Sequence, residues 1–197
     1  IILFNFSSCK SEKKAKNNTE VKVEAKKEAA FSLKTATNEI NFTAYKTTDK
    51  VPVGGQFKSV DIISGGEGNS IKEAINNAEF SIPVSSIFTK DTSRDYKIKK
   101  FFFGIMENTK LLSGKLVVEN DSIGYANIKM NNVTQKVPFT YSILDKTFSM
   151  NATMDITNWN ATTALTSLNT ACIDLHKGAD GVSKTWSEVA LKITSEF

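Results

Sequence analysis

Cysteine and histidine are the residue types in this chain best suited to catalysis or metal binding, and both are scarce. The chain has two cysteines, Cys9 and Cys172, and a single histidine, His176. One histidine cannot supply the several His and Cys ligands of a typical zinc site. His176 stands between Asp174 and Asp180, a spacing that permits an oxygen-rich cation loop, but a histidine in a surface loop is the simpler interpretation. We therefore expect no metal site.

Catalytic motifs are also missing. Cys172 follows Leu165 and Leu168 on the apolar side of a predicted helix, so we interpret it as a buried structural thiol. The glycine-rich stretch 64–70 lacks the Lys-Ser/Thr ending of a phosphate-binding loop and is interpreted as a flexible turn. No nucleophile has a candidate base beside it. We therefore expect no catalytic residues and no enzyme activity.

The net charge of +4 is distributed unevenly along the chain. Residues 10–30 contain seven lysines and four glutamates, a net of +3, which leaves about +1 for the remainder. Arg94 is the only arginine. A nearly neutral folded part with one arginine argues against a nucleic-acid partner, because such proteins carry clustered positive charge.

Composition divides the chain into three zones. Residues 1–9 are apolar and then small, which is typical of the end of a signal peptide. Residues 10–30 contain no aromatic side chain and are predicted to be a flexible charged linker. Residues 31–197 are predicted to form one folded domain. No stretch of the chain reaches the roughly 18–20 apolar residues that cross a bilayer.

The third zone contains short segments in which apolar and polar residues alternate, the pattern of half-buried strands. Short turn signals separate them, which favours antiparallel hairpins. The clearest alternating segments are 39–45, 78–84, 137–143, 148–156 and 188–194.

Helical patterns are few. Residues 70–78 begin with Ser70 and Glu73 at the spacing of a capping box, and residues 91–102 begin with the cap candidates Asp91 and Thr92. A third pattern covers residues 160–172, before the last strand. The expected fold is all-β: an antiparallel, lipocalin-like β-barrel with two or three short helices.

Large apolar side chains at inward positions are the candidate binding residues. In a small barrel they would fill the interior, and in a wider barrel they would line a cavity for an apolar ligand. The alternation is compatible with both arrangements. The candidates are Phe42, Phe80, Ile82, Phe101, Phe102, Phe139, Tyr141, Phe148, Met150, Met154 and Trp186.

Five segments, in order, give the folded zone a resemblance to the YceI-like domain family of lipocalin-like polyisoprenoid-binding proteins. The most recognisable is "AEFSIPVSSIFTKDTSRDYKIKKFFF", a strand followed by a short helix that ends in phenylalanines. The segments are 38–47, 50–62, 78–103, 112–143 and 184–197. Many relatives have histidines around the first strand, where this chain has Thr37, Asn38 and Lys46. The segment 159–181 looks like an insertion of a subgroup.

The resemblance implies a non-enzymatic carrier that holds a long isoprenoid or other amphiphilic lipid in an elongated apolar lumen, without another cofactor. An envelope stress or interaction protein with a filled barrel is the alternative. "FSSC", residues 6–9, resembles a bacterial lipobox, so Cys9 is expected to carry a lipid. Residues 10–30 would then tether the barrel to a membrane of the bacterial cell envelope, on its periplasmic or surface side. The sequence leaves open whether the protein forms a homodimer.

Overall fold

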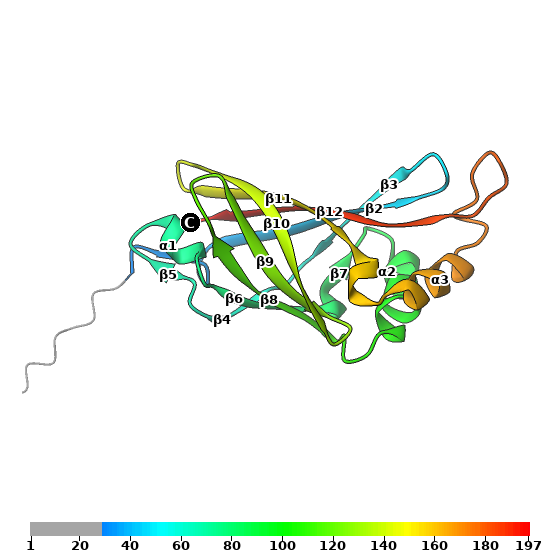
Figure 1. Ribbon diagram of the computed structural model, residues 1–197, viewed down its shortest axis with the longest axis horizontal. Helices are drawn as coiled ribbons and strands as arrows, with labels where there is room; N and C mark the ends of the chain where they lie inside the picture. The colour runs from blue at the N-terminus through cyan, green and yellow to red at the C-terminus, as the bar shows by residue number, and fades with distance from the viewer. Residues whose placement is uncertain (1–28) are drawn as a thin grey trace, which may run out of the picture.

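The protein is a strongly curled antiparallel sheet with helices at both ends, seen in a computed structural model that describes residues 29–197 (Figure 1). Ten strands form the main sheet in the order β4-β6-β8-β9-β10-β11-β12-β2-β3-β7, and β1 pairs with β5 in a separate small sheet. Because β4 and β7 remain its two edges, the sheet is a half-barrel. The predicted lipocalin-like fold with short helices is confirmed.

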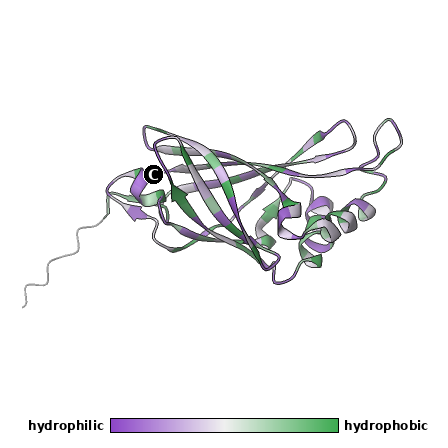
Figure 2. Ribbon diagram, viewed as in Figure 1, coloured by the Kyte–Doolittle hydropathy of each residue, from purple (hydrophilic) through white to green (hydrophobic). Residues whose placement is uncertain are grey.

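The strand bounds follow the alternating segments of the sequence. The strands are β1 (Phe31–Ser32), β2 (Thr37–Lys46), β3 (Val51–Phe57), β4 (Asp61–Ser64), β5 (Glu67–Gly68), β6 (Glu79–Pro83), β7 (Ile87–Phe88), β8 (Leu111–Val118), β9 (Ile123–Met130), β10 (Val133–Leu144), β11 (Thr147–Asp155) and β12 (Thr185–Glu196). Each strand contains both hydrophobic and hydrophilic residues, as Figure 2 shows, because one face of the curled sheet points inward and the other outward.

Three short α-helices, α1 (Ile71–Ile75), α2 (Thr92–Phe101) and α3 (Thr162–Ala171), lie where the sequence predicts them. Ser70 caps α1 by accepting a hydrogen bond from the Glu73 backbone N–H at 3.2 Å. Asp91 caps α2 by accepting one from the Arg94 backbone N–H at 3.0 Å. Three single-turn 3-10 helices, η1 (Val84–Ser86), η2 (Phe103–Ile105) and η3 (Ile156–Trp159), complete the described chain.

The hairpin of β10 and β11 shows how pairing sets the inner face. Tyr141 is paired with Met150 across the two strands, and Phe139 with Ala152. Directly paired residues of an antiparallel ladder point to the same side of the sheet. The large side chains of both strands therefore share the inner face, and the polar residues between them face outward.

The buried side chains form two clusters at opposite ends of the half-barrel. At the end covered by α2 and α3, which we call the helical end, Trp159 is 1% exposed and packs with neighbours that include Phe103 and Ile156. At the other end, which we call the α1 end, Phe148 and Ile75 are each 1% exposed. The space between the two clusters is where a ligand site would have to lie.

Candidate functional site

An internal cavity of about 230 Å³ runs between the two clusters. Its walls come from the inner faces of the strands and from α1, α2 and α3. Among the described residues that line it, Asn38, Thr185 and Ser195 are the only polar ones, and every other lining side chain is aliphatic, aromatic or methionine. Ser195 donates a hydrogen bond to Asn38 at 2.6 Å, so these two polar groups satisfy each other. The cavity thus offers an apolar environment along its length.

The cavity is elongated along β12. Alternate residues of this strand line it from Val189 through Leu191 and Ile193 to Ser195, and Thr185 and Trp186 line its far end. Ten residue steps at about 3.3 Å each correspond to roughly 30 Å of strand. This shape matches an extended chain better than a compact molecule.

The interior is hollow because several inward side chains lie flat against the sheet. Phe42 and Phe80 line the cavity and remain only partly buried. Each ring lies over a glycine of the neighbouring strand: a Cβ at Gly55 would overlap the Phe42 ring, and one at Gly114 would come within 2.7 Å of the Phe80 ring. Glycine at these positions leaves room for the rings beside the wall, so they do not fill the lumen.

Eight of the eleven candidate residues line this cavity: Phe42, Phe80, Ile82, Phe102, Phe148, Met150, Met154 and Trp186. They come from β2, β6, α2's C-terminal cap, β11 and β12, which are far apart in sequence. The structure therefore brings most of the predicted set together around one lumen.

Phe101, Phe139 and Tyr141 do not line the cavity, and this corrects their predicted position. Phe101 ends α2 and packs edge-on against Tyr96, with ring centroids 6.5 Å apart, and Tyr96 is 54% exposed. Phe139 and Tyr141 do point inward, but they are buried in the cluster at the α1 end. The Tyr141 hydroxyl donates to the backbone oxygen of Asn120 at 2.5 Å, which fixes the ring there.

Several lining residues were not among the candidates. Leu165 and Leu168 of α3 and Ile98 of α2 close the cavity at the helical end. Leu191 and Ile193 belong to an alternating segment that the sequence shows clearly, so the same pattern could have identified them. Leu165 and Leu168 lie on the apolar side of a helix that the sequence predicts, but the docking of this helix over the open end of the lumen could not be read from that pattern.

A polar network borders the cavity at the helical end. The His176 Nδ1 atom lies 2.6 Å from the Thr185 hydroxyl, which itself donates to Asn169 at 2.9 Å. Burial, together with the positive charges of Lys46, Lys97 and Arg94, lowers the pKa of His176 to about 4. His176 is therefore neutral at neutral pH. Within residues 29–197, no group of three or more His, Cys, Asp or Glu side chains could hold a metal ion.

His176 should make the protein less stable as the pH falls. The unfolded chain protonates this residue near pH 6.5 and the folded protein only near pH 4, so the unfolded state binds more protons between these values. The free energy of unfolding should be unaffected by His176 above pH 6.5 and should decrease from there towards pH 4. Urea unfolding at about pH 7 and about pH 5 checks this, with His176→Asn showing a smaller loss. Equal losses in both proteins would contradict the prediction.

Cys172 is a buried thiol whose pKa is raised by burial, and it forms no disulfide within the described residues. Cys9, the predicted lipidation site, lies outside the described residues, as do the predicted signal segment and linker up to residue 28. None of the helices in residues 29–197 is long and apolar enough to span a membrane.

An antiparallel half-barrel that encloses an elongated apolar lumen defines a lipocalin-like fold. Residues 31–197 match the YceI-like domain, and the chain belongs to that family. No relative was found among curated protein sequences.

Two solved structures share the fold. The first is a polyisoprenoid-binding domain from Saccharophagus degradans, implicated in plant cell wall breakdown; it is 14% identical, with a TM-score of 0.60, and the match covers 85% of this chain and 98% of that one. The second is BcnA from Burkholderia cenocepacia, which is 14% identical, with a TM-score of 0.50 and coverage of 80% and 94%.

Proposed function

We propose that this protein binds one long-chain amphiphile, of the isoprenoid or a similar lipid class, in the lumen of the half-barrel. The observation that carries the proposal is the hollow, almost wholly apolar cavity that follows β12 from Thr185 to Ser195. A filled barrel would have no such space. The polyisoprenoid-binding domain of similar fold supports the choice of ligand class.

Hydrophobic burial is sufficient to drive such binding. Removing several hundred Å² of apolar surface from water, at about 25 cal/mol per Å², contributes on the order of 10 kcal/mol before association costs are subtracted. The lumen has few polar groups that could orient a polar ligand along its length, so chain length should determine affinity. The protein would act as a carrier or store, without chemistry on the lipid.

Titration of the delipidated full chain with prenols of increasing length tests the proposal. Affinity should rise from geraniol through farnesol to geranylgeraniol, because each added methylene buried in the lumen contributes up to about 0.8 kcal/mol. Calorimetry or displacement of a fluorescent lipid would measure it. An affinity that does not change with chain length would contradict binding in the lumen.

We further propose that the protein is anchored in the bacterial cell envelope through Cys9, by the lipobox-like "FSSC" and the charged linker that follows. The described chain enters the fold at the α1 end (Figure 1), so the anchor would attach opposite the helical end. Two acyl chains on one cysteine would suffice for stable attachment, whereas one is marginal.

Cys9→Ala should release the protein from membranes. In cells that process lipoproteins, we expect the wild-type chain to sediment with membranes and the variant to appear in the soluble fraction, because the variant lacks the acylated sulfur. Cys172→Ala is the matched control and should leave the distribution unchanged. Equal membrane retention of the Cys9 variant would overturn the anchoring proposal and leave lipid binding untouched.

A further inference from the structure

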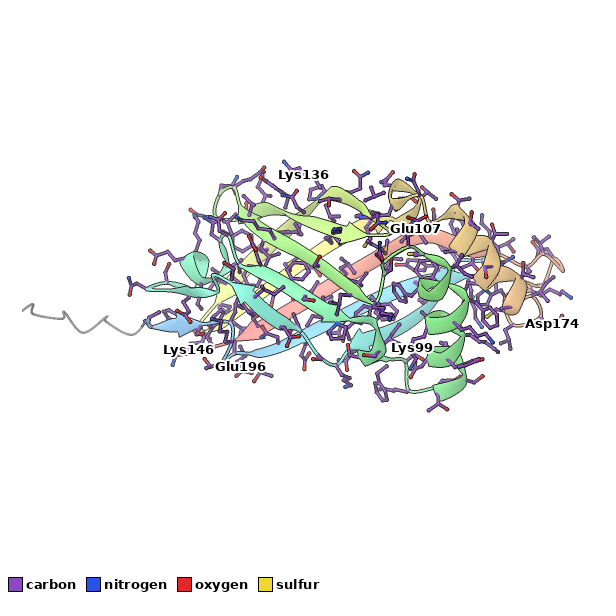
Figure 3. The ribbon with its side chains drawn as sticks, turned by 90° about the horizontal axis from the view of Figure 1, so that it is seen from below. Lys99, Glu107, Lys136, Lys146, Asp174 and Glu196 are labelled. Atoms are coloured by element: carbon purple, nitrogen blue, oxygen red, sulfur yellow. The ribbon has the colours of Figure 1, made fainter. Side chains whose placement is uncertain are left out.

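Positively charged residues of α2 and β2 neighbour cavity-lining residues at the helical end. On α2, Arg94 and Lys97 are spaced three residues apart on the face that also carries Ile98, a lining residue. Both cations are half-buried, in contrast to Lys99 on the same helix, which is exposed. Figure 3 shows Lys99 on this helix, at the same end of the molecule as Asp174 and far from Lys146 and Glu196.

Lys46, on the sheet, also lies at the helical end of the cavity. It ends β2 and is paired with Thr185, which lines the cavity. Its Nζ atom donates to the backbone oxygen of Leu175 at 3.0 Å, which holds the side chain over the loop that carries His176. Burial and the charges of Lys46, Lys97 and Arg94 lower the pKa of His176, which agrees with the position of Lys46 beside the Leu175 backbone and of Lys97 next to the lining residue Ile98.

No carboxylate within residues 29–197 is paired directly with these two lysines, although Lys97 adds to the backbone N–H and the charge of Arg94 in lowering the pKa of Asp91. The ion pairs at this end of the molecule join other residues: Lys50 with Glu188 at 2.9 Å, Lys177 with Asp174 at 3.4 Å and Arg94 with Asp91 at 3.6 Å. Neither Lys46 nor Lys97 forms an ion pair with any described carboxylate.

The remaining acidic groups near α2 are already occupied. Asp95 is buried and accepts hydrogen bonds from the Thr89 backbone N–H at 2.8 Å and from its hydroxyl at 2.6 Å. Asp91 caps α2 and lies 3.6 Å from Arg94, and both side chains are about half exposed. The helical end therefore combines an apolar lining with two partly buried lysine residues that form no ion pair with a described carboxylate.

We propose that Lys46 and Lys97 bind the anionic head, a carboxylate or a phosphate, of the amphiphile whose chain occupies the lumen. This inference rests on the proposed function. Ile98 follows Lys97 on α2 and Thr185 is paired with Lys46, and both line the cavity, so they would contact the first carbons of the chain. Half-buried ammonium groups interact with an anion more strongly than exposed ones, because water and salt screen them less.

Matched ligands that differ only in the head test the proposal. Oleate against oleyl alcohol tests a carboxylate, and geranylgeranyl phosphate against geranylgeraniol tests a phosphate. The wild-type full chain should bind at least one acid about tenfold more tightly than its alcohol, a difference of about 1.4 kcal/mol. The pair that shows the preference identifies the head.

Lys46→Gln combined with Lys97→Gln should abolish the preference while the affinity for the alcohol stays unchanged. Lys99→Gln, on the exposed face of α2, is the matched control and should keep the preference, as should the charge-conserving Lys97→Arg. Thermal melting verifies that each variant is folded.

The outcomes separate the two proposals. Equal affinities of acid and alcohol in the wild-type protein would overturn the anionic-head site. A preference for the acid that survives the double substitution would overturn it as well. Neither result would contradict lipid binding in the lumen. Failure of all four ligands to bind would overturn the proposed function itself.

Discussion

Ala44→Trp should abolish most lipid binding without unfolding the protein. Ala44 lies on β2, where it is paired with Val53 and Val189, and its methyl group lines the cavity. An indole there would occupy the narrow lumen that the chain needs, so the affinity for geranylgeraniol should fall at least about tenfold. Because the interior is hollow, the stability cost should stay within the roughly 1–3 kcal/mol typical of overpacking.

The adjacent residue provides a matched control. Thr43 is on the same strand but on the opposite face, in a shallow depression on the outside of the sheet. Thr43→Trp adds a similar side chain in place of a small one and should leave lipid affinity unchanged. Titration of both variants with geranylgeraniol makes the comparison. Full affinity in Ala44→Trp, or an equal loss in both variants, would show that the chain does not occupy this lumen.

Trp159→Ala should cause the largest loss of stability among single substitutions considered. Trp159 is 1% exposed, and its Nε1 donates to the backbone oxygen of Ile128 at 2.9 Å. Truncation would leave a cavity in the cluster at the helical end and remove that hydrogen bond. We expect the free energy of unfolding to fall by about 3–5 kcal/mol, which corresponds to a drop of roughly 6–20 °C in Tm for a domain of this size.

A substitution of the second tryptophan, Trp186, distinguishes the effect of lost core packing from the effect of lost ligand contact. Trp186 is only partly buried, and it lines the cavity with its Nε1 donating to the backbone oxygen of Thr47 at 2.8 Å. Trp186→Ala should therefore cost less stability and weaken lipid binding more. Urea unfolding of the two variants measures the difference. A Trp159→Ala protein as stable as Trp186→Ala would contradict the assigned core role.

Local signals in the sequence were sufficient to predict most of the secondary structure. The helix caps at Ser70 and Asp91 follow from side chains that accept hydrogen bonds from backbone N–H groups three residues later. The inner face of β11 follows from the alternation through Phe148, Met150 and Met154, because successive strand residues point to opposite sides. Both depend only on neighbours along the chain.

The hollow interior could not be predicted from alternation, which is the same for a filled barrel. It depends on how far the sheet curls and on cross-strand neighbours, such as Gly55 beneath Phe42. The position of Phe101 was wrong for a related reason. Phe101 ends α2, Phe102 caps it and Phe103 begins η2, and only the docking of this segment decides that Phe102 and Phe103, and not Phe101, reach the cavity.

The charged surroundings of the helical end were equally hidden in the sequence. Lys46 and Lys97 belong to a strand and a helix that are distant along the chain, and the composition is nearly neutral there. Their shared effect on His176 appears only when β2, α2 and the loop after α3 are folded together.

Native mass spectrometry of the Cys9→Ala protein, which carries no anchor and is purified from bacterial cells without detergent, tests the central claim most directly. We predict an additional mass that corresponds to one long-chain lipid, that is lost on extraction with organic solvent, and that is strongly reduced in Ala44→Trp. A Cys9→Ala protein with an otherwise unchanged lumen that carries no lipid, and that takes up no geranylgeraniol after extraction, would contradict the account.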